Sequence, residues 1–192
     1  MLTTISEKCA AFILQDDNRE DAFAVCAYGI ELALYTIFST CGLLLIGWVF
    51  NRLVDAIIII FFYYSNQTVG GGFHASSHLR CFSMMSVGLL VCISILSVPF
   101  RVAIHITSLL LSLIALWIYP VELHPNKKYL VKNLPKLKRK SKLISLLLCL
   151  LALFLVLQYN QNSVANAASL GMLVSAISRV CGHLSYCKRE SA

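Results

Sequence analysis

The sequence predicts an all-α polytopic membrane protein with about six transmembrane helices and an amphipathic helix at its N-terminus. Of the 192 residues, 58% are hydrophobic, and long apolar runs alternate with short polar segments over most of the chain. The mean hydropathy of +0.77 exceeds what a soluble domain of this size can hide in a core, so the surplus must face lipid. We expect a single membrane-embedded domain, residues 1–192, without a soluble domain or an internal repeat.

Residues 1–21 predict the amphipathic helix. Leu2, Ile5 and Cys9 fall at near-helical intervals, and charged residues stand between them. Such a helix lies on the membrane surface or packs its apolar stripe on the rest of the protein, and the pattern fits both arrangements. The segment lacks the basic start and the small-residue cleavage site of a signal peptide, so we expect the retained apolar segments to direct insertion.

Six apolar segments predict the crossings of the membrane. At ~1.5 Å per residue, a helix needs about 20 residues to cross a hydrocarbon core of about 30 Å. The segments are residues 32–50, 53–64, 82–98, 102–118, 143–159 and 164–180. The second spans only if its helix continues beyond Tyr64 into the polar residues that follow.

The distribution of basic residues predicts the orientation, because Lys and Arg are retained on the cytoplasmic side. The polar loop 119–142 carries eight of them and is therefore expected to be cytoplasmic, where it can also bind anionic lipid headgroups. Six crossings then place both termini on the same side, with fourteen of the sixteen basic residues. Because the net charge of +7 gathers at the edges of apolar runs, it does not indicate nucleic-acid binding.

Candidate chemistry gathers in residues 70–81, Gly-Gly-Gly-Phe-His-Ala-Ser-Ser-His-Leu-Arg-Cys. A cysteine attacks a carbonyl as the thiolate, so it needs a base or a positive field, and this stretch supplies His74, His78 and Arg80 beside Cys81. On a straight helix His74 and Cys81 would share a face but lie roughly 10 Å apart. If this pair acts together, the stretch cannot be one straight helix, whereas His78 would be the nearer base on a continuous one.

The same residues allow other interpretations. His74, His78 and Cys81 could offer three ligands to zinc, although the stretch lacks the glutamate that a zinc hydrolase uses as its acid and base. They could also be amphipathic residues at a helix end. The eight cysteines imply no disulfide framework, because several lie inside apolar runs as small hydrophobic residues. We expect Cys81 to be the most reactive of them.

Two acidic residues lie within apolar runs, where an acid usually marks function or pairing. Asp55 stands three residues after Arg52, so an ordinary ion pair on a helix explains it. Glu31 enters its apolar run from the inner side, where it could orient His74 as a triad acid does, or make a structural bond near the helix start.

The spacing Gly-Gly-x-His-Ala, with a cysteine seven residues after the histidine, closely resembles the accessory gene regulator protein B family. Here it comprises Gly71, Gly72, His74, Ala75 and Cys81. Further similar motifs are Tyr-Gly-Ile-Glu at 28–31, and Tyr-Pro-Val-Glu at 119–122 with Asn-Lys at 126–127. This chain departs from the family at 65–68, where members often carry basic residues, and at 128–129, where a proline often follows Asn-Lys.

The resemblance implies a bacterial cell-membrane cysteine endopeptidase that cleaves the C-terminal tail from a small autoinducer precursor and promotes its cyclisation to a thiolactone or lactone. It implies Cys81 as nucleophile and His74 as base, at the cytoplasmic face, with no metal or cofactor. Gly71 and Gly72 are candidate oxyanion donors, and Glu31 and Arg80 are candidates for shaping the site. The expected partners are the lipid bilayer, a second copy of the chain in a homodimer, and a precursor with an amphipathic N-terminus, a central Cys or Ser and an acidic tail.

The rival function is that of a small membrane transporter or a non-enzymatic, partner-binding subunit. A transporter should place polar groups near the middle of the membrane. The apolar runs carry little there besides hydroxyls such as Ser94 and Ser112, which favours an enzyme with an interfacial site.

Overall fold

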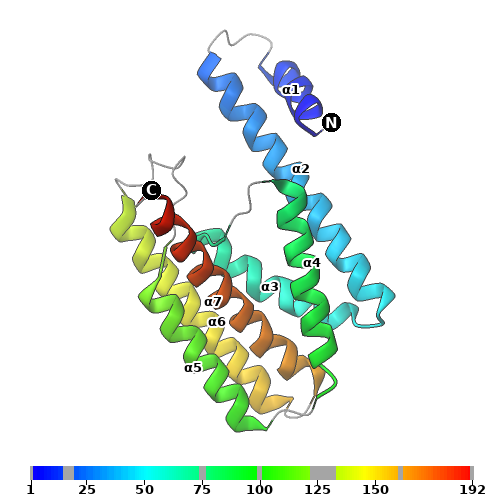
Figure 1. Ribbon diagram of the computed structural model, residues 1–192, viewed down its shortest axis with the longest axis vertical. Helices are drawn as coiled ribbons and strands as arrows, with labels where there is room; N and C mark the ends of the chain where they lie inside the picture. The colour runs from blue at the N-terminus through cyan, green and yellow to red at the C-terminus, as the bar shows by residue number, and fades with distance from the viewer. Residues whose placement is uncertain are drawn as a thin grey trace. The chain divides into compact units, whose positions relative to one another are not determined.

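The computed structural model describes residues 2–14, 20–73, 77–98, 101–121, 133–159 and 162–190. In these ranges the chain is helical, without strands (Figure 1). The helices are α1 (Leu2–Ile13), α2 (Glu20–Val49), α3 (Leu53–Gly70), α4 (His78–Ile95), α5 (Val102–Ile118), α6 (Leu134–Gln158) and α7 (Ser163–Glu190). The predicted all-α fold is confirmed.

Each of the six predicted crossings coincides with a helix. By length and composition, four are able to cross a membrane: Phe23–Val49, Leu53–Gly70, Leu134–Gln158 and Ser163–Ser185. The apolar helices α4 and α5 are shorter, and both lie in the regions predicted to cross. Helix α3, which corresponds to the second predicted crossing, does continue beyond Tyr64, as that crossing requires. Large side chains such as Phe61 and Phe154 are exposed on the helix surfaces. The protein is therefore a polytopic helical membrane protein.

The chain forms two compact units, Met1–Leu45 and Ile46–Ala192. In the first, α1 is the predicted amphipathic helix, although it ends at Ile13 and residues 15–19 lie outside the described residues. Thr3 Oγ1 donates a hydrogen bond to Glu31 Oε1 at 3.5 Å, which joins α1 to α2. Glu31 thus makes the kind of structural bond that was one of its two predicted roles.

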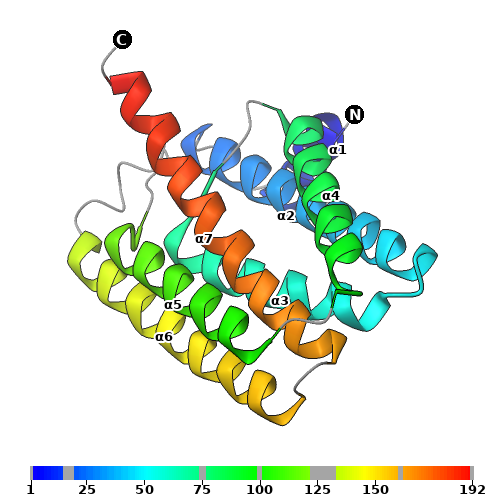
Figure 2. The same ribbon diagram turned by 60° about the horizontal axis from the view of Figure 1, so that its bottom comes forward.

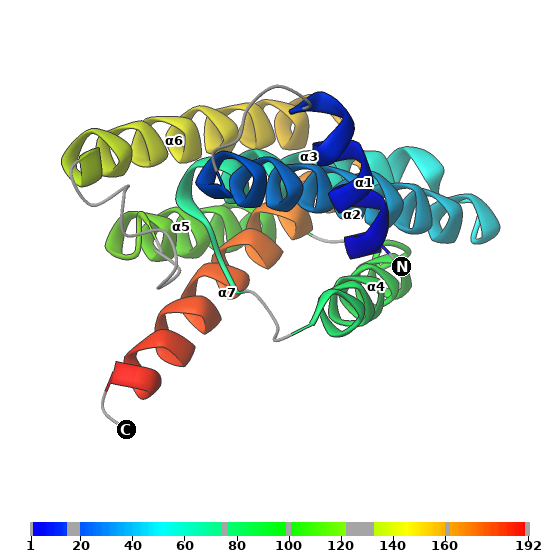
Figure 3. The ribbon, with the colours of Figure 1, turned by 90° about the horizontal axis from the view of Figure 1, so that it is seen from above.

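In the second unit, α7 packs against α3, α5 and α6, and the side chains between them form the hydrophobic core. Figure 2 shows α5 and α6 side by side with α7 crossing them, and in Figure 3 α7 continues past both toward its C-terminus. Small residues permit this packing: a Cβ on Gly171 would lie 2.9 Å from Phe62 Cβ and 3.2 Å from Ile59 Cα. Such close backbone approach is how helices associate in a membrane, where lipid is as apolar as the helices themselves.

The C-terminal end of α4 is tied to its neighbours by polar side chains. Asn166 Nδ2 of α7 donates to the carbonyls of Leu96 at 2.9 Å and Val98 at 3.0 Å. Arg52 donates from Nη2 to Ser97 Oγ at 3.1 Å, and its Nη1 lies 3.5 Å from Asp55 Oδ2. The predicted ion pair between Arg52 and Asp55 is confirmed, and the same arginine also holds α4.

The interior of this unit holds polar side chains with partners on other helices and loops. Asn66, His105 and Asn166 are all buried. Asn66 Oδ1 accepts from Ser145 Oγ at 2.9 Å, and His105 Nδ1 lies 2.7 Å from Ser169 Oγ. Partners on other segments bond at least one polar atom of each group, and a single sequence does not reveal such pairings. All three residues lie near or beyond the ends of the apolar runs, so the expectation that the middle of these runs holds little besides small hydroxyls stays a prediction.

Helix α6 begins nine residues earlier than its apolar run. It was expected from Leu143, but it begins at Leu134, so residues 136–142 of the predicted loop are helical. Pro135 stands in the first turn, where its missing N–H costs nothing and its fixed φ favours a helix start. The basic residues therefore lie on a helix, while residues 122–132 of the loop lie outside the described residues.

Candidate active site

Helix α3 ends in the glycine segment, Gly70–Phe73, and each glycine meets a different requirement. Gly71 has φ 69° and ψ −163°, a conformation that is essentially restricted to glycine. A Cβ on Gly70 would collide with the guanidinium group of Arg179, and one on Gly72 with the side-chain amide of Gln67. The segment is thus shaped by one backbone conformation and two close contacts.

The glycine segment rests on one face of α7. The Phe73 N–H donates to the carbonyl of Ser178 at 3.0 Å and lies 3.3 Å from its Oγ, and this hydroxyl is 3.4 Å from the hydroxyl of Tyr63. A Cβ on Gly182 would lie 2.9 Å from the carbonyl carbon of Gly72 and 2.9 Å from the Phe73 nitrogen. The backbone that leads into His74 is therefore packed directly on the backbone of α7.

Arg179 also belongs to this face, and its side chain is fully buried. Its Nη1 donates to the carbonyls of Tyr119 at 3.3 Å and Pro120 at 2.5 Å and to Ser141 Oγ at 3.2 Å, while Nη2 donates to the carbonyl of Asn66 at 2.8 Å. The sequence interpretation counted Arg179 only as a basic residue of the cytoplasmic side. Its position as a single arginine in the apolar run 164–180 was the signal that was missed, because a charge in such a run usually has a specific role.

Cys81 lies in the first turn of α4 and is half-buried. Ser77 caps this helix: its Oγ accepts from the Arg80 N–H at 3.3 Å, and its carbonyl accepts from the Cys81 N–H at 3.1 Å. Cys81 therefore lies at the positive end of the helix dipole. It is also within electrostatic range of the Tyr63 hydroxyl, on the α3 face that adjoins the glycine segment.

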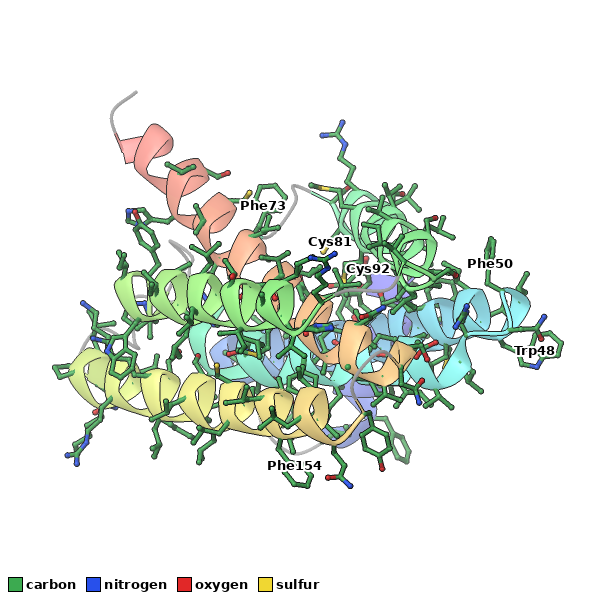
Figure 4. The ribbon with its side chains drawn as sticks, turned by 90° about the horizontal axis from the view of Figure 1, so that it is seen from below. Trp48, Phe50, Phe73, Cys81, Cys92 and Phe154 are labelled. Atoms are coloured by element: carbon green, nitrogen blue, oxygen red, sulfur yellow. The ribbon has the colours of Figure 1, made fainter. Side chains whose placement is uncertain are left out.

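Figure 4 labels Cys81 on α4 and Phe73 on the glycine segment. Because α3 ends at Gly70 and α4 begins at His78, the stretch 70–81 is not one straight helix. The sequence analysis required such a break in the helix if His74 and Cys81 are to act together. His74 itself lies outside the described residues, as does the side chain of His78, so the choice of base stays a prediction.

The remaining predicted site residues are placed as follows. The Gly71 N–H donates to the carbonyl of Gln67 at 2.8 Å and so closes α3, while a role for the Gly72 N–H in an oxyanion hole stays a prediction. Arg80 is exposed at the start of α4. Of the three zinc ligands considered, the structure describes only the side chain of Cys81, and no metal-binding cluster of three His, Cys, Asp or Glu occurs among the side chains it describes.

The described cysteines, which exclude Cys187, are free thiols with different exposure. Cys9, Cys41 and Cys181 are exposed, whereas Cys92 and Cys149 are buried. Exposure alone therefore does not single out Cys81. What distinguishes Cys81 is its position at the start of a helix, next to the glycine segment.

The basic start of α6 is linked to the glycine segment through Arg179. Lys136, Lys138, Arg139 and Lys140 are exposed, whereas Ser141 points inward to Arg179. Lys142 Nζ lies over the Trp117 ring, 5.7 Å from its centroid, which contributes a cation–π contact to the packing of α5 on α6. Through Arg179, the basic helix start and the glycine segment are joined to the same buried side chain.

The helices and this half-buried cysteine define a polytopic membrane protein with a candidate thiol site at one end of a helical bundle. The family model described as Accessory gene regulator B matches residues 6–179. The chain therefore belongs to the accessory gene regulator B family, whose members take part in autoinducer processing at the membrane. Searches of curated proteins and of solved structures found no match.

Proposed function

We propose that this protein is a membrane cysteine endopeptidase that removes the C-terminal tail from a small autoinducer precursor. Family membership supports a role in autoinducer processing. The observation that carries the finer proposal is Cys81, half-buried in the first turn of a capped helix and preceded by a non-helical glycine segment that leads into His74. This arrangement suits a nucleophile whose base comes from the linking segment rather than from its own helix.

In the proposed reaction, His74 takes the proton of the Cys81 thiol and the thiolate attacks the carbonyl carbon ahead of the precursor's tail. The resulting oxyanion is stabilised by backbone N–H groups, for which the Gly72 N–H is a candidate. When the carbon–nitrogen bond breaks, the tail leaves as an amine with the proton that His74 carried. The precursor remains joined to Cys81 as a thioester.

The thioester then passes to a nucleophile of the precursor itself. A cysteine thiol of the precursor gives its proton to His74 and attacks the thioester carbonyl. The carbon–sulfur bond to Cys81 breaks, the cyclic thiolactone is released, and the proton on His74 returns to the Cys81 sulfur. A serine hydroxyl would give a lactone by the same exchange. Neither step consumes an oxidant or a cofactor.

The basic start of α6 supports the recognition of an acidic tail. Four exposed cations, at positions 136 and 138–140, stand on the helix whose Ser141 bonds Arg179, the residue that packs on Gly70. Because they are exposed, their attraction for a carboxylate-rich tail is screened by salt, with a Debye length of about 8 Å at physiological ionic strength. We therefore expect KM for the precursor to rise with salt more than kcat falls.

The test uses the full-length protein in vesicles with a synthetic precursor, taken from a short open reading frame beside the gene, that has a central Cys and an acidic tail. Cys81→Ala should abolish cleavage, and His74→Ala should lower kcat by about 10² to 10⁴ because a general base is lost. His78→Ala should have little effect. Cys92→Ala, a buried cysteine of the same helix, is the matched control and should keep cleavage.

Other outcomes separate the alternatives. Cleavage that survives Cys81→Ala would end the cysteine-peptidase proposal. If a chelator stops cleavage, and the three variants at His74, His78 and Cys81 all lose bound metal, a zinc site is indicated instead. Equal losses at the two histidines without metal would show that the base was assigned wrongly.

A further inference from the structure

The face of α7 under the glycine segment consists of Ser178, Arg179 and Gly182. We propose that this face is a positioning element, which fixes the glycine segment and through it holds His74 where it can exchange a proton with Cys81. The inference rests on the proposed function, because it assigns a role within the same site. It concerns residues about 100 positions along the chain from the sequence motif.

Gly182 sets the distance between α7 and the glycine segment. A Cβ at this position would lie 2.9 Å from two backbone atoms, the Gly72 carbonyl carbon and the Phe73 nitrogen. Backbone atoms cannot rotate away as a side chain can. Gly182→Ala must therefore move the segment by about 0.5 Å, the difference between 2.9 Å and the 3.4 Å at which ordinary van der Waals contact begins.

Ser178 sets the direction in which the chain leaves the segment. Its carbonyl and its hydroxyl lie 3.0 Å and 3.3 Å from the Phe73 nitrogen. Phe73 directly precedes His74, so these contacts constrain where the next residue begins. Displacement by a fraction of an ångström is enough to affect a proton transfer, because catalysis depends steeply on the placement of the reacting groups.

Arg179 connects the segment to the start of the basic loop. Its guanidinium packs on Gly70 and donates to the carbonyl of Asn66 in the last turn of α3. The same group donates to the carbonyls of Tyr119 and Pro120, where the loop begins. The planar fork of arginine suits several carbonyls at once, and lysine does not reproduce it.

The experiment measures how fast iodoacetamide alkylates each cysteine of the full-length protein in vesicles between pH 5 and 9, by mass spectrometry. In wild type, Cys81 should react on the order of 10-fold faster at pH 7 than in His74→Ala, because the base raises the thiolate fraction. Among the described side chains, Tyr63 of α3 and Arg80 of α4 lie near Cys81, and neither residue type titrates between pH 5 and 8. Histidine does titrate there, so His78→Ala is measured as well, because His78 stands three residues before Cys81 in the sequence. On α7, the rings of His183 and Tyr119 stack with their centroids 4.5 Å apart. His183→Gln is therefore the control for any contribution of this histidine to the pH profile.

Gly182→Ala should shift the pH profile of Cys81 toward that of His74→Ala and slow its alkylation at pH 7 several-fold, by up to about 10-fold. The rate at Cys149 should stay slow, because this buried cysteine packs in the core with residues of α7, and its protection shows that the bundle remains folded. Gly88→Ala in α4 is the matched control, since nothing lies within 4 Å of a Cβ at that position. In the His74→Ala background, Gly182→Ala should have no further effect, because the two substitutions act on the same interaction.

The outcomes distinguish this inference from the proposed function. If His74→Ala slows Cys81 but Gly182→Ala leaves the wild-type profile, the positioning role is wrong and the peptidase proposal stands. If His74→Ala itself leaves Cys81 unchanged, the proposed pair fails and the inference fails with it. If Gly182→Ala does not fold, the same measurement is made on Ser178→Ala. A smaller shift of the Cys81 pH profile in the same direction supports the inference, and a wild-type profile contradicts it.

Discussion

The two ends of α4 are positioned in different ways. Its C-terminal end is held by side chains, with Asn166 donating to two carbonyls and Arg52 donating to Ser97. Its N-terminal end follows the glycine segment, which lies on α7 through backbone contacts that leave no space for a Cβ at Gly182. The position of one end of α4 thus depends on hydrogen bonds from side chains, and the position of the other end depends on close packing that only glycine permits.

This difference separates stability from activity. A hydrogen bond between side chain and backbone contributes about 1 kcal/mol, and its loss weakens the fold without moving a distant thiol far. A close backbone contact has no such tolerance, because the smallest added group displaces the chain. We therefore expect substitutions at the C-terminal end of α4 to lower stability, and substitutions in the glycine segment to lower activity.

The largest effect is expected at Gly71. Gly71→Ala forces a Cβ into a backbone conformation that costs about 1 to 3 kcal/mol for other residues, so the segment should rearrange and cleavage of the precursor should fall by about 10²-fold. The measurement is kcat for the synthetic precursor, with thermal unfolding recorded in parallel. Gly88→Ala should retain both, and a Gly71→Ala protein with wild-type kcat would contradict the comparison.

A smaller effect is expected at Gly72. Here a Cβ meets the end of the flexible Gln67 side chain rather than backbone, so Gly72→Ala should lower cleavage by only about 10-fold. Shortening the obstructing residue should restore space, and the double variant with Gln67→Ala should cleave faster than Gly72→Ala alone. If the second substitution brings no recovery, steric conflict with Gln67 is not the cause of the loss.

The smallest effect on activity is expected at the other end of the helix. Asn166→Ala removes two hydrogen bonds from buried carbonyls and should lower the free energy of unfolding by about 1 to 3 kcal/mol, while cleavage changes less than about threefold. The exposed Gln158 at the end of α6 provides the control, since Gln158→Ala should change neither quantity. A large loss of kcat in folded Asn166→Ala protein would show that the two ends are not independent.

Hydropathy predicted the helices of this fold well, because apolar length is a local property of the chain. It predicted a helix in each of the six regions that α2 to α7 occupy, and a simple i,i+3 relation predicted the pair of Arg52 and Asp55. It did not predict the start of α6, because the first turns of this helix are rich in charged residues and Pro135 stands in the first of them. The predicted site residues were found by a motif, not by periodicity.

The parts that the sequence did not predict depend on contacts between distant residues. Arg179 binds Asn66 across 113 positions and Tyr119 across 60 positions, and no local pattern announces such partners. The same holds for Gly182 and Gly72. A glycine-rich motif indicated that space was needed near the site, but only the packing of α7 shows what fills that space.

The backbone angles of Gly71 also have a consequence for chirality. Reversing the signs of φ 69° and ψ −163° gives a conformation close to polyproline II, which L residues adopt readily. At this one position the chain therefore has the geometry of a D-amino acid, and glycine fits because it has no handedness. In a protein assembled by chemical ligation, D-alanine at position 71 should be accommodated where L-alanine is not.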